Sequence, residues 1–229
     1  MNTRSSIYLL APLLMVGVAA SAQQPTNAPG SPAPNSIPAQ IIGKTPAKPG
    51  AASAPRPKLL ADGSLAPDFV SIDLAGKTMR PSDWKGKVVV LDFWATWCGP
   101  CQRSLPHTQE VAKHLKDQGV VVLASCTSDT RAKFEEWVKA NQATYPDITF
   151  TCDPNERGSA TYEDRASKKL YGVSGIPTQF IIGRDGRIAA SLVGYSDGDA
   201  RLEASLAKVG VQVDPLIAAK GEGQIKKNN

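Results

Sequence analysis

Two cysteines, Cys98 and Cys101, are separated by two residues. This spacing indicates a chemical reaction more directly than any other feature of the sequence. They follow an apolar run typical of a buried strand and open a run typical of a helix. A thiol at a helix start lies at the positive end of the helix dipole, which stabilises the thiolate that attacks disulfides. Gly99 and Pro100 suit the turn between the thiols. The pattern predicts a dithiol–disulfide exchange centre, in which Cys98 attacks and the deeper Cys101 resolves the mixed disulfide.

A metal site is the main alternative for such a pair of cysteines. A structural zinc site takes about four ligands. The remaining candidate ligands stand at no paired spacing: they are Cys126, Cys152, His107 and His114. Both histidines fall on the helix after the pair and are expected on its surface. We therefore expect redox chemistry, with no metal and no other cofactor.

An acidic residue, Asp92, interrupts the apolar run Val88–Trp94 that precedes the pair. The alternation of side chains along a strand directs it to the core beneath the following helix. Burial raises the pKa of a carboxyl group, which would suit Asp92 to take the proton of Cys101. The alternative is a buried polar residue that has no catalytic role and only costs stability.

Strands and helices alternate along the middle of the chain, and together they must position these residues. Strands are expected at 66–73, 78–80, 87–94, 120–124, 148–151, 177–182 and 187–193, and helices at 101–118, 130–141, 159–171 and from Asp197 or Asp199 to about Gly210. This order predicts an α/β fold whose sheet contains parallel strands and is covered on both faces. The turn at Asp185-Gly186 makes the closing strands an antiparallel hairpin.

The first residues have the pattern of an export signal. Arg4 is followed by the apolar segment Ile7–Ala20, which is shorter than the ~20 residues of a membrane span. Ala20-Ser21-Ala22 fits a signal-peptidase site, so residues 1–22 are expected to be a signal peptide cleaved after Ala22. Pro12 argues against a retained anchor. The protein is therefore expected in the periplasm or secreted.

The segments on either side of the expected domain, residues 65–210, are unlike it in composition. Residues 23–64 are rich in Pro and Ala, and half of the 18 prolines fall between Pro25 and Pro57, which predicts a disordered linker. Residues 211–229 form a polar, basic tail. Much of the net charge of +5 lies in these flanks, so we expect no nucleic-acid surface. Four cysteines are too few for a disulfide scaffold.

Five stretches in the expected domain resemble the extracytoplasmic thioredoxin-like reductases of the TlpA and ResA type. They are Ala66-Pro67-Asp68-Phe69, Trp84-Lys85-Gly86-Lys87, Phe93 to Cys101, Gly175-Ile176-Pro177-Thr178 and Asp185-Gly186-Arg187-Ile188. The resemblance covers the whole domain in order. It implies a thioredoxin-like three-layer fold, with a central mixed sheet, helices on both faces and an N-terminal β-hairpin.

The same resemblance assigns substrate-facing positions. Pro177 corresponds to a cis-proline beside the disulfide, which would leave the Ile176 backbone free to pair with an extended substrate chain. Trp97, with Gly99 and Pro100, is expected to face the substrate.

The sequence departs from the TlpA and ResA pattern at two positions. Asp92 matches the residue of thioredoxins proper, whereas many TlpA-type proteins have Asn at this position and Glu in the helix where this chain has Ser104.

The resemblance also implies a second, structural disulfide. In the family's fold the strands before Cys126 and Cys152 are parallel neighbours, which implies a bond between these two cysteines.

These features lead us to expect a periplasmic enzyme that reduces protein disulfides and is re-reduced by a membrane thiol donor. By resemblance, apocytochrome c is a candidate substrate, and we expect a monomer. The enzyme alternatives are a disulfide oxidase or isomerase, or a thiol peroxidase, although Leu91 and Ala95 stand where a peroxidase pattern needs Pro and Thr. The non-enzyme alternative is an exported copper carrier or adaptor.

Overall fold

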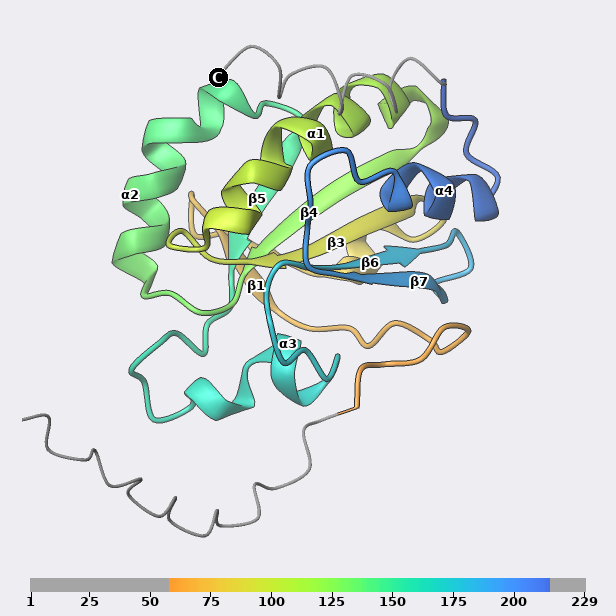
Figure 1. Ribbon diagram of the computed structural model, residues 1–229. Helices are drawn as coiled ribbons and strands as arrows, with labels where there is room; N and C mark the ends of the chain where they lie inside the picture. The colour runs from red at the N-terminus through yellow and green to blue at the C-terminus, as the bar shows by residue number, and fades with distance from the viewer. Residues whose placement is uncertain (1–57, 215–229) are drawn as a thin grey trace, which may run out of the picture. The chain divides into compact units, whose positions relative to one another are not determined.

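A computed structural model describes residues 58–214 of the chain (Figure 1). The expected signal peptide, most of the linker and most of the tail lie outside the described residues. The described part contains a seven-stranded sheet in the order β2-β1-β5-β4-β3-β6-β7. Its strands are β1 Ser71–Asp73, β2 Thr78–Met79, β3 Val88–Trp94, β4 Val120–Cys126, β5 Ile148–Cys152, β6 Thr178–Ile182 and β7 Ile188–Val193.

The sheet is mixed and lies between two layers. Strands β3, β4 and β5 are parallel, whereas β1 and β2 at one edge and β6 and β7 at the other add antiparallel pairs. The helices α1 (Gly99–Leu115), α2 (Arg131–Asn141) and α4 (Arg201–Lys208) cover one face, and the short α3 (Ala166–Lys169) lies on the other (Figure 1). The predicted three-layer α/β architecture with an N-terminal hairpin is confirmed.

Strand β3 is buried along its whole length and divides the core in two. Val88, Val90 and Trp94 pack into the cluster beneath α1, α2 and α4. Val89, Leu91 and Phe93 belong to the cluster on the opposite face. Because side chains alternate along a strand, Asp92 lies on the same face as Val90 and Trp94. The expected burial of Asp92 under the helix layer is therefore confirmed, with 1% of the residue exposed.

The prediction of one helix over 159–171 is wrong. The segment contains a 3₁₀ turn at Tyr162–Asp164 and only the four residues of α3. Between them Arg165 is extended, with φ −52° and ψ 139°. The buried carboxylate of Asp153 accepts the Ala166 N–H at 2.7 Å. This carboxylate holds the start of α3 against the end of β5, so the two short pieces do not merge into one helix.

The ordered domain extends beyond the predicted limits at both ends. Residues 58–64, expected in the linker, lie against it: Leu60 N donates to Tyr171 O at 3.1 Å. Gly172 permits this approach, because a Cβ there would lie 2.1 Å from the Lys58 carbonyl oxygen. At the other end Val211, expected in the tail, is buried in the core.

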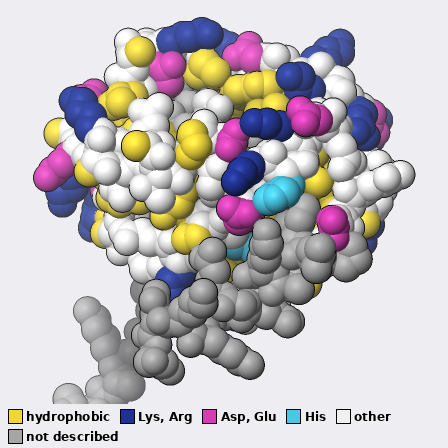
Figure 2. Space-filling view, turned by 90° about the horizontal axis from the view of Figure 1, so that it is seen from above, with side chains coloured by type: hydrophobic (Ala, Val, Ile, Leu, Met, Phe, Trp, Pro, Cys, Tyr) yellow, Lys and Arg dark blue, Asp and Glu magenta, His cyan; other side chains and the backbone are white. Residues whose placement is uncertain are grey.

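Figure 2 shows the face of the molecule seen from above the α1 and α4 layer. Basic and acidic side chains are interspersed on this face, with apolar side chains between them. In residues 58–214, none of the helices has both the length and the apolar character that crossing a bilayer requires.

Candidate active site

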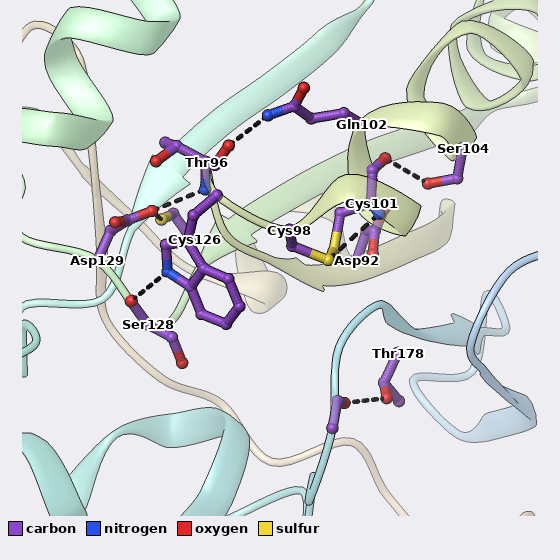
Figure 3. The surroundings of a disulfide bond; sticks show 12 residues. Asp92, Thr96, Cys98, Cys101, Gln102, Ser104, Cys126, Ser128, Asp129 and Thr178 are labelled. Atoms are coloured by element: carbon purple, nitrogen blue, oxygen red, sulfur yellow. Dashed lines mark hydrogen bonds between the residues drawn. A yellow bond between two sulfur atoms is a disulfide. The ribbon is translucent and has the colours of Figure 1, made fainter. Parts of the chain in front are cut away.

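Cys98 and Cys101 form a disulfide at the junction of β3 and α1 (Figure 3). Their sulfurs are 2.01 Å apart and their Cα atoms 5.2 Å apart. Cys98 is 4% exposed and Cys101 1% exposed. Cys101 is thus the deeper of the two, as predicted. A substrate would reach Cys98 before Cys101.

The first turn of α1 is arranged around the Cys98 sulfur. Cys98 is the N-cap residue of the helix, and Gly99 and Pro100 are its first two helical residues. The Cys101 backbone N–H donates to Cys98 Sγ at 3.2 Å. A helix N-terminus favours negative charge, and an N–H that points at a sulfur stabilises its thiolate. The geometry therefore suits Cys98 to be the nucleophile.

The loop before Cys98 is fixed by the loop that follows β4. The Thr96 N–H donates to Asp129 Oδ2 at 2.7 Å, and Trp97 Nε1 donates to the Ser128 carbonyl at 3.0 Å (Figure 3). Trp97 remains 54% exposed beside the disulfide. Asp129 and Ser128 are site residues that the sequence reasoning missed. Their position directly after β4 could have indicated this role. The carboxyl ends of parallel β3 and β4 lie at the same edge of the sheet, so residues that follow β4 lie near those that follow β3.

Asp92 carries a perturbed carboxyl group. Burial raises its pKa to about 6, and the hydrogen bond that Gln179 Nε2 donates to Asp92 Oδ2 at 3.1 Å acts in the opposite direction. The other oxygen, Oδ1, is buried without a hydrogen-bond partner. Figure 3 shows Asp92 on the Cys101 side of the disulfide. A carboxyl group with a pKa near neutrality can take and return a proton at physiological pH.

Pro177 begins the segment that leads into β6. The Ile176–Pro177 peptide bond is cis, as the resemblance implied. Ile176 and Trp97 line a groove of about 480 Å³ together with Ser128, Arg165, Lys168 and Ser174. Of the expected substrate-facing residues, Trp97 and Ile176 thus share one groove, whereas Gly99, Pro100 and Pro177 are not among the residues that line it.

The expected Cys126–Cys152 disulfide is not formed: both cysteines are free and buried. They are register partners on parallel β4 and β5, so the expected adjacency is confirmed. The two thiols interact as neighbouring reduced groups, and each also donates a hydrogen bond, Cys126 Sγ to Asp129 Oδ2 and Cys152 Sγ to Asp153 O, both at 3.6 Å. The neighbouring Cys152 thiol and burial raise the pKa of Cys126 well above its ordinary value. The Cys126 thiol is therefore protonated and unreactive.

The histidines differ from the prediction in one respect. His114 is exposed, as expected, but the His107 side chain is only 8% exposed, since α4 packs on α1 there and brings Glu203 Oε1 to 2.7 Å from His107 Nε2. Across residues 58–214, the acidic, histidine and cysteine side chains form no group of three or more that could hold a metal ion.

Comparison with known proteins gives consistent results. The model of the AhpC/TSA family matches residues 63–191. The thiol-disulfide oxidoreductase ResA of Geobacillus thermodenitrificans is 34% identical over 137 residues, which are 59% of this chain and 71% of that protein. ResA of Bacillus subtilis is 33% identical over 135 residues, 59% of this chain and 69% of that protein. A crystal structure from Chlorobium tepidum, described as a thiol:disulfide interchange protein DsbE, superposes with a TM-score of 0.54 and 36% identity over 66% of this chain and 99% of that one.

Proposed function

The chain belongs to the AhpC/TSA family and is a thiol-disulfide oxidoreductase of the ResA and DsbE type, and on this premise we propose that it reduces protein disulfides outside the cytoplasm. The observation that carries the proposal is the disulfide between Cys98 and Cys101 at the start of α1. In the reduced protein these two thiols are the electron source.

Cys98 performs the first step. Its thiolate attacks one sulfur of the substrate disulfide, forms a mixed disulfide with it and releases the other substrate sulfur as a thiolate. The Cys101 N–H and the α1 dipole stabilise the attacking thiolate. Trp97 and the Ile176 backbone border the groove in which the substrate chain lies during this step.

Cys101 performs the second step. Its proton passes to Asp92, and the resulting thiolate attacks Cys98 Sγ. The Cys98–Cys101 bond forms, the mixed disulfide breaks, and the second substrate sulfur leaves as a thiol after protonation. Two electrons have then passed from the protein to the substrate. The buried Asp92, with its free Oδ1 and a pKa of about 6, supports its role as the proton acceptor.

Two features support the cellular setting that we propose. The export pattern of residues 1–22 supports a location in the periplasm or beyond, with Gln23 as the first mature residue. An exported reductase needs an outside source of electrons, which we assign to a membrane thiol donor. Apocytochrome c, whose haem site contains two cysteines, is a candidate substrate.

The reduction potential of the Cys98–Cys101 pair tests the direction of the reaction. Gly99-Pro100 between the cysteines resembles thioredoxin, so we expect a value near the ~−270 mV of thioredoxin. The measurement is an equilibrium titration of the protein with glutathione redox buffers, read by mass spectrometry after alkylation. A value near the ~−120 mV of the strong periplasmic oxidant would contradict the proposed reductase and indicate a disulfide oxidase.

A further inference from the structure

The carboxyl group of Asp92 has two oxygens in unequal surroundings. Gln179 Nε2 donates to Oδ2 at 3.1 Å, and Oδ1 has no partner although it is fully buried. Asp92 on β3 and Gln179 on β6 are register partners in an antiparallel pair. Their side chains therefore leave the sheet at the same place and on the same face.

The Gln179 amide is itself held in place. Its Nε2 also lies 3.4 Å from Thr108 Oγ1, and the Thr108 hydroxyl donates to the Ser104 carbonyl at 3.0 Å. Gln179 and Thr108 are both buried. A contact from α1 thus fixes the amide, so that it presents an N–H to Asp92 from the β6 side.

The neighbouring elements bring further titratable groups near Asp92 and Gln179. Helix α1 contributes the Cys101 thiol and His107, whose partner Glu203 comes from α4. His107 borders a cavity of about 10 Å³ that Gln179 also lines, and the segment between β7 and α4 adds the titratable groups of Tyr195 and Asp199 to its lining. Strand β4 places Ala124 opposite Asp92. Within residues 58–214, Gln179 is the side chain that donates a hydrogen bond to the Asp92 carboxyl group.

We propose that Gln179 is a positioning residue for the resolving step: its amide holds Oδ2 of Asp92 and leaves Oδ1 free to accept the proton of Cys101. The inference rests on the proposed function, in which Asp92 is that acceptor. Gln179 also sets the pH at which the acceptor works, because a donor to an ionised carboxylate favours the charged form.

Replacing Gln179 with methionine tests the inference, since methionine keeps the length of the side chain and removes the donor. Loss of a hydrogen bond to a charged group is expected to raise the Asp92 midpoint by about one pH unit. With the wild-type midpoint at about 6, less Asp92 is then ionised, and reduction of insulin disulfides slows by about fivefold near pH 6 and about twofold near pH 7. Near pH 8 the rate is almost unchanged.

Two measurements follow the midpoint of the Asp92 titration. One is the acid limb of the pH profile, that is, the fall of kcat/KM for insulin reduction at low pH, with dithiothreitol as the thiol donor. The other is the ¹³C NMR titration of the Asp92 carboxyl group in the oxidised protein, which does not depend on activity. Gln179→Leu is the second variant if the methionine protein does not fold.

A matched control is available in the same protein. Gln109 also donates through Nε2 to a carboxylate, Asp147 Oδ2 at 2.7 Å, and its amide oxygen accepts the Asp147 N–H. Gln109→Met is expected to leave both readouts unchanged. If it moves the Asp92 midpoint as far as Gln179→Met does, general loosening of the structure explains the shift and the inference is overturned.

Asp92→Asn separates the inference from the proposed function. If the acid limb disappears in Asp92→Asn but stays unmoved in the Gln179 variants, Gln179 has no positioning role and the proposed function stands. If the limb persists in Asp92→Asn, a group other than Asp92 produces it. Both the inference and the role of Asp92 in the proposed function then fail.

Discussion

Cys98→Ser is expected to abolish the reduction of insulin disulfides and leave only the background rate of the thiol donor. A serine hydroxyl is not ionised at neutral pH and cannot form a disulfide, so neither exchange step can occur. The free cysteines do not substitute for Cys98, because Cys126 and Cys152 are buried and the pKa of Cys126 is raised well above its ordinary value. The measurement is insulin precipitation in the presence of dithiothreitol.

Cys152→Ala is the matched control, because it removes one sulfur from a buried position on β5 outside the proposed exchange steps. Its activity should be close to that of the wild type. Substantial activity in Cys98→Ser would show that the Cys98 thiol is not the nucleophile. Equal loss in both variants would show that the assay responds to damaged packing.

Asp92→Asn is expected to have opposite effects on rate and stability. The variant cannot accept the proton of Cys101, so insulin reduction near pH 7 should slow by about 10- to 100-fold. This loss of rate is no larger than the smallest effects typical of a general base. A thiol of ordinary pKa is already partly ionised near pH 7, so the second step can proceed slowly without a proton acceptor. The second step should slow more than the first, so the mixed disulfide accumulates during turnover.

The stability effect follows from the raised pKa of Asp92. The folded carboxyl group has a pKa of about 6 against an ordinary value of 3.8, so the folded protein binds the proton more tightly than the unfolded chain does. The wild type therefore loses stability as pH rises from about 4 to about 6 and stays at the lower value above that. The difference in pKa corresponds to about 3 kcal/mol.

Urea unfolding of the oxidised proteins checks this effect. Asp92→Asn should be more stable than the wild type near pH 8 by up to about 3 kcal/mol and similar to it near pH 4. The comparison at low pH is the internal control, because Asp92 is then protonated in both states. A variant that is less stable than the wild type near pH 8 would contradict burial as the cause of the raised pKa.

Much of this fold could be predicted because its signals are local. The run Val88–Trp94 predicts a strand buried on both faces, and the cysteine spacing predicts the helix start at Cys98. The 159–171 segment could not be predicted, because the contact that interrupts it comes from Asp153, at the end of another strand. A local pattern contains no information about such a contact.

The site divides in the same way. Cys98, Cys101 and the cis-proline were found from local patterns and a family resemblance. Gln179 and Asp129 were missed, because their importance depends on the pairing of β6 with β3 and of β4 with β3. The adjacency of Cys126 and Cys152 was implied by the family resemblance, and the pairing of β4 with β5 confirms it. That both thiols remain free and donate hydrogen bonds to Asp129 and Asp153 was not implied.

The most direct test of the central claim is to identify the covalent adduct that Cys101→Ser forms with a substrate. The reduced variant, mixed with a peptide disulfide, is expected to form one stable mixed disulfide. Peptide mapping by mass spectrometry should place it on Cys98, because the resolving thiol is absent. An adduct on Cys126 or Cys152, or no adduct under conditions in which the wild type reduces the peptide, would contradict the account.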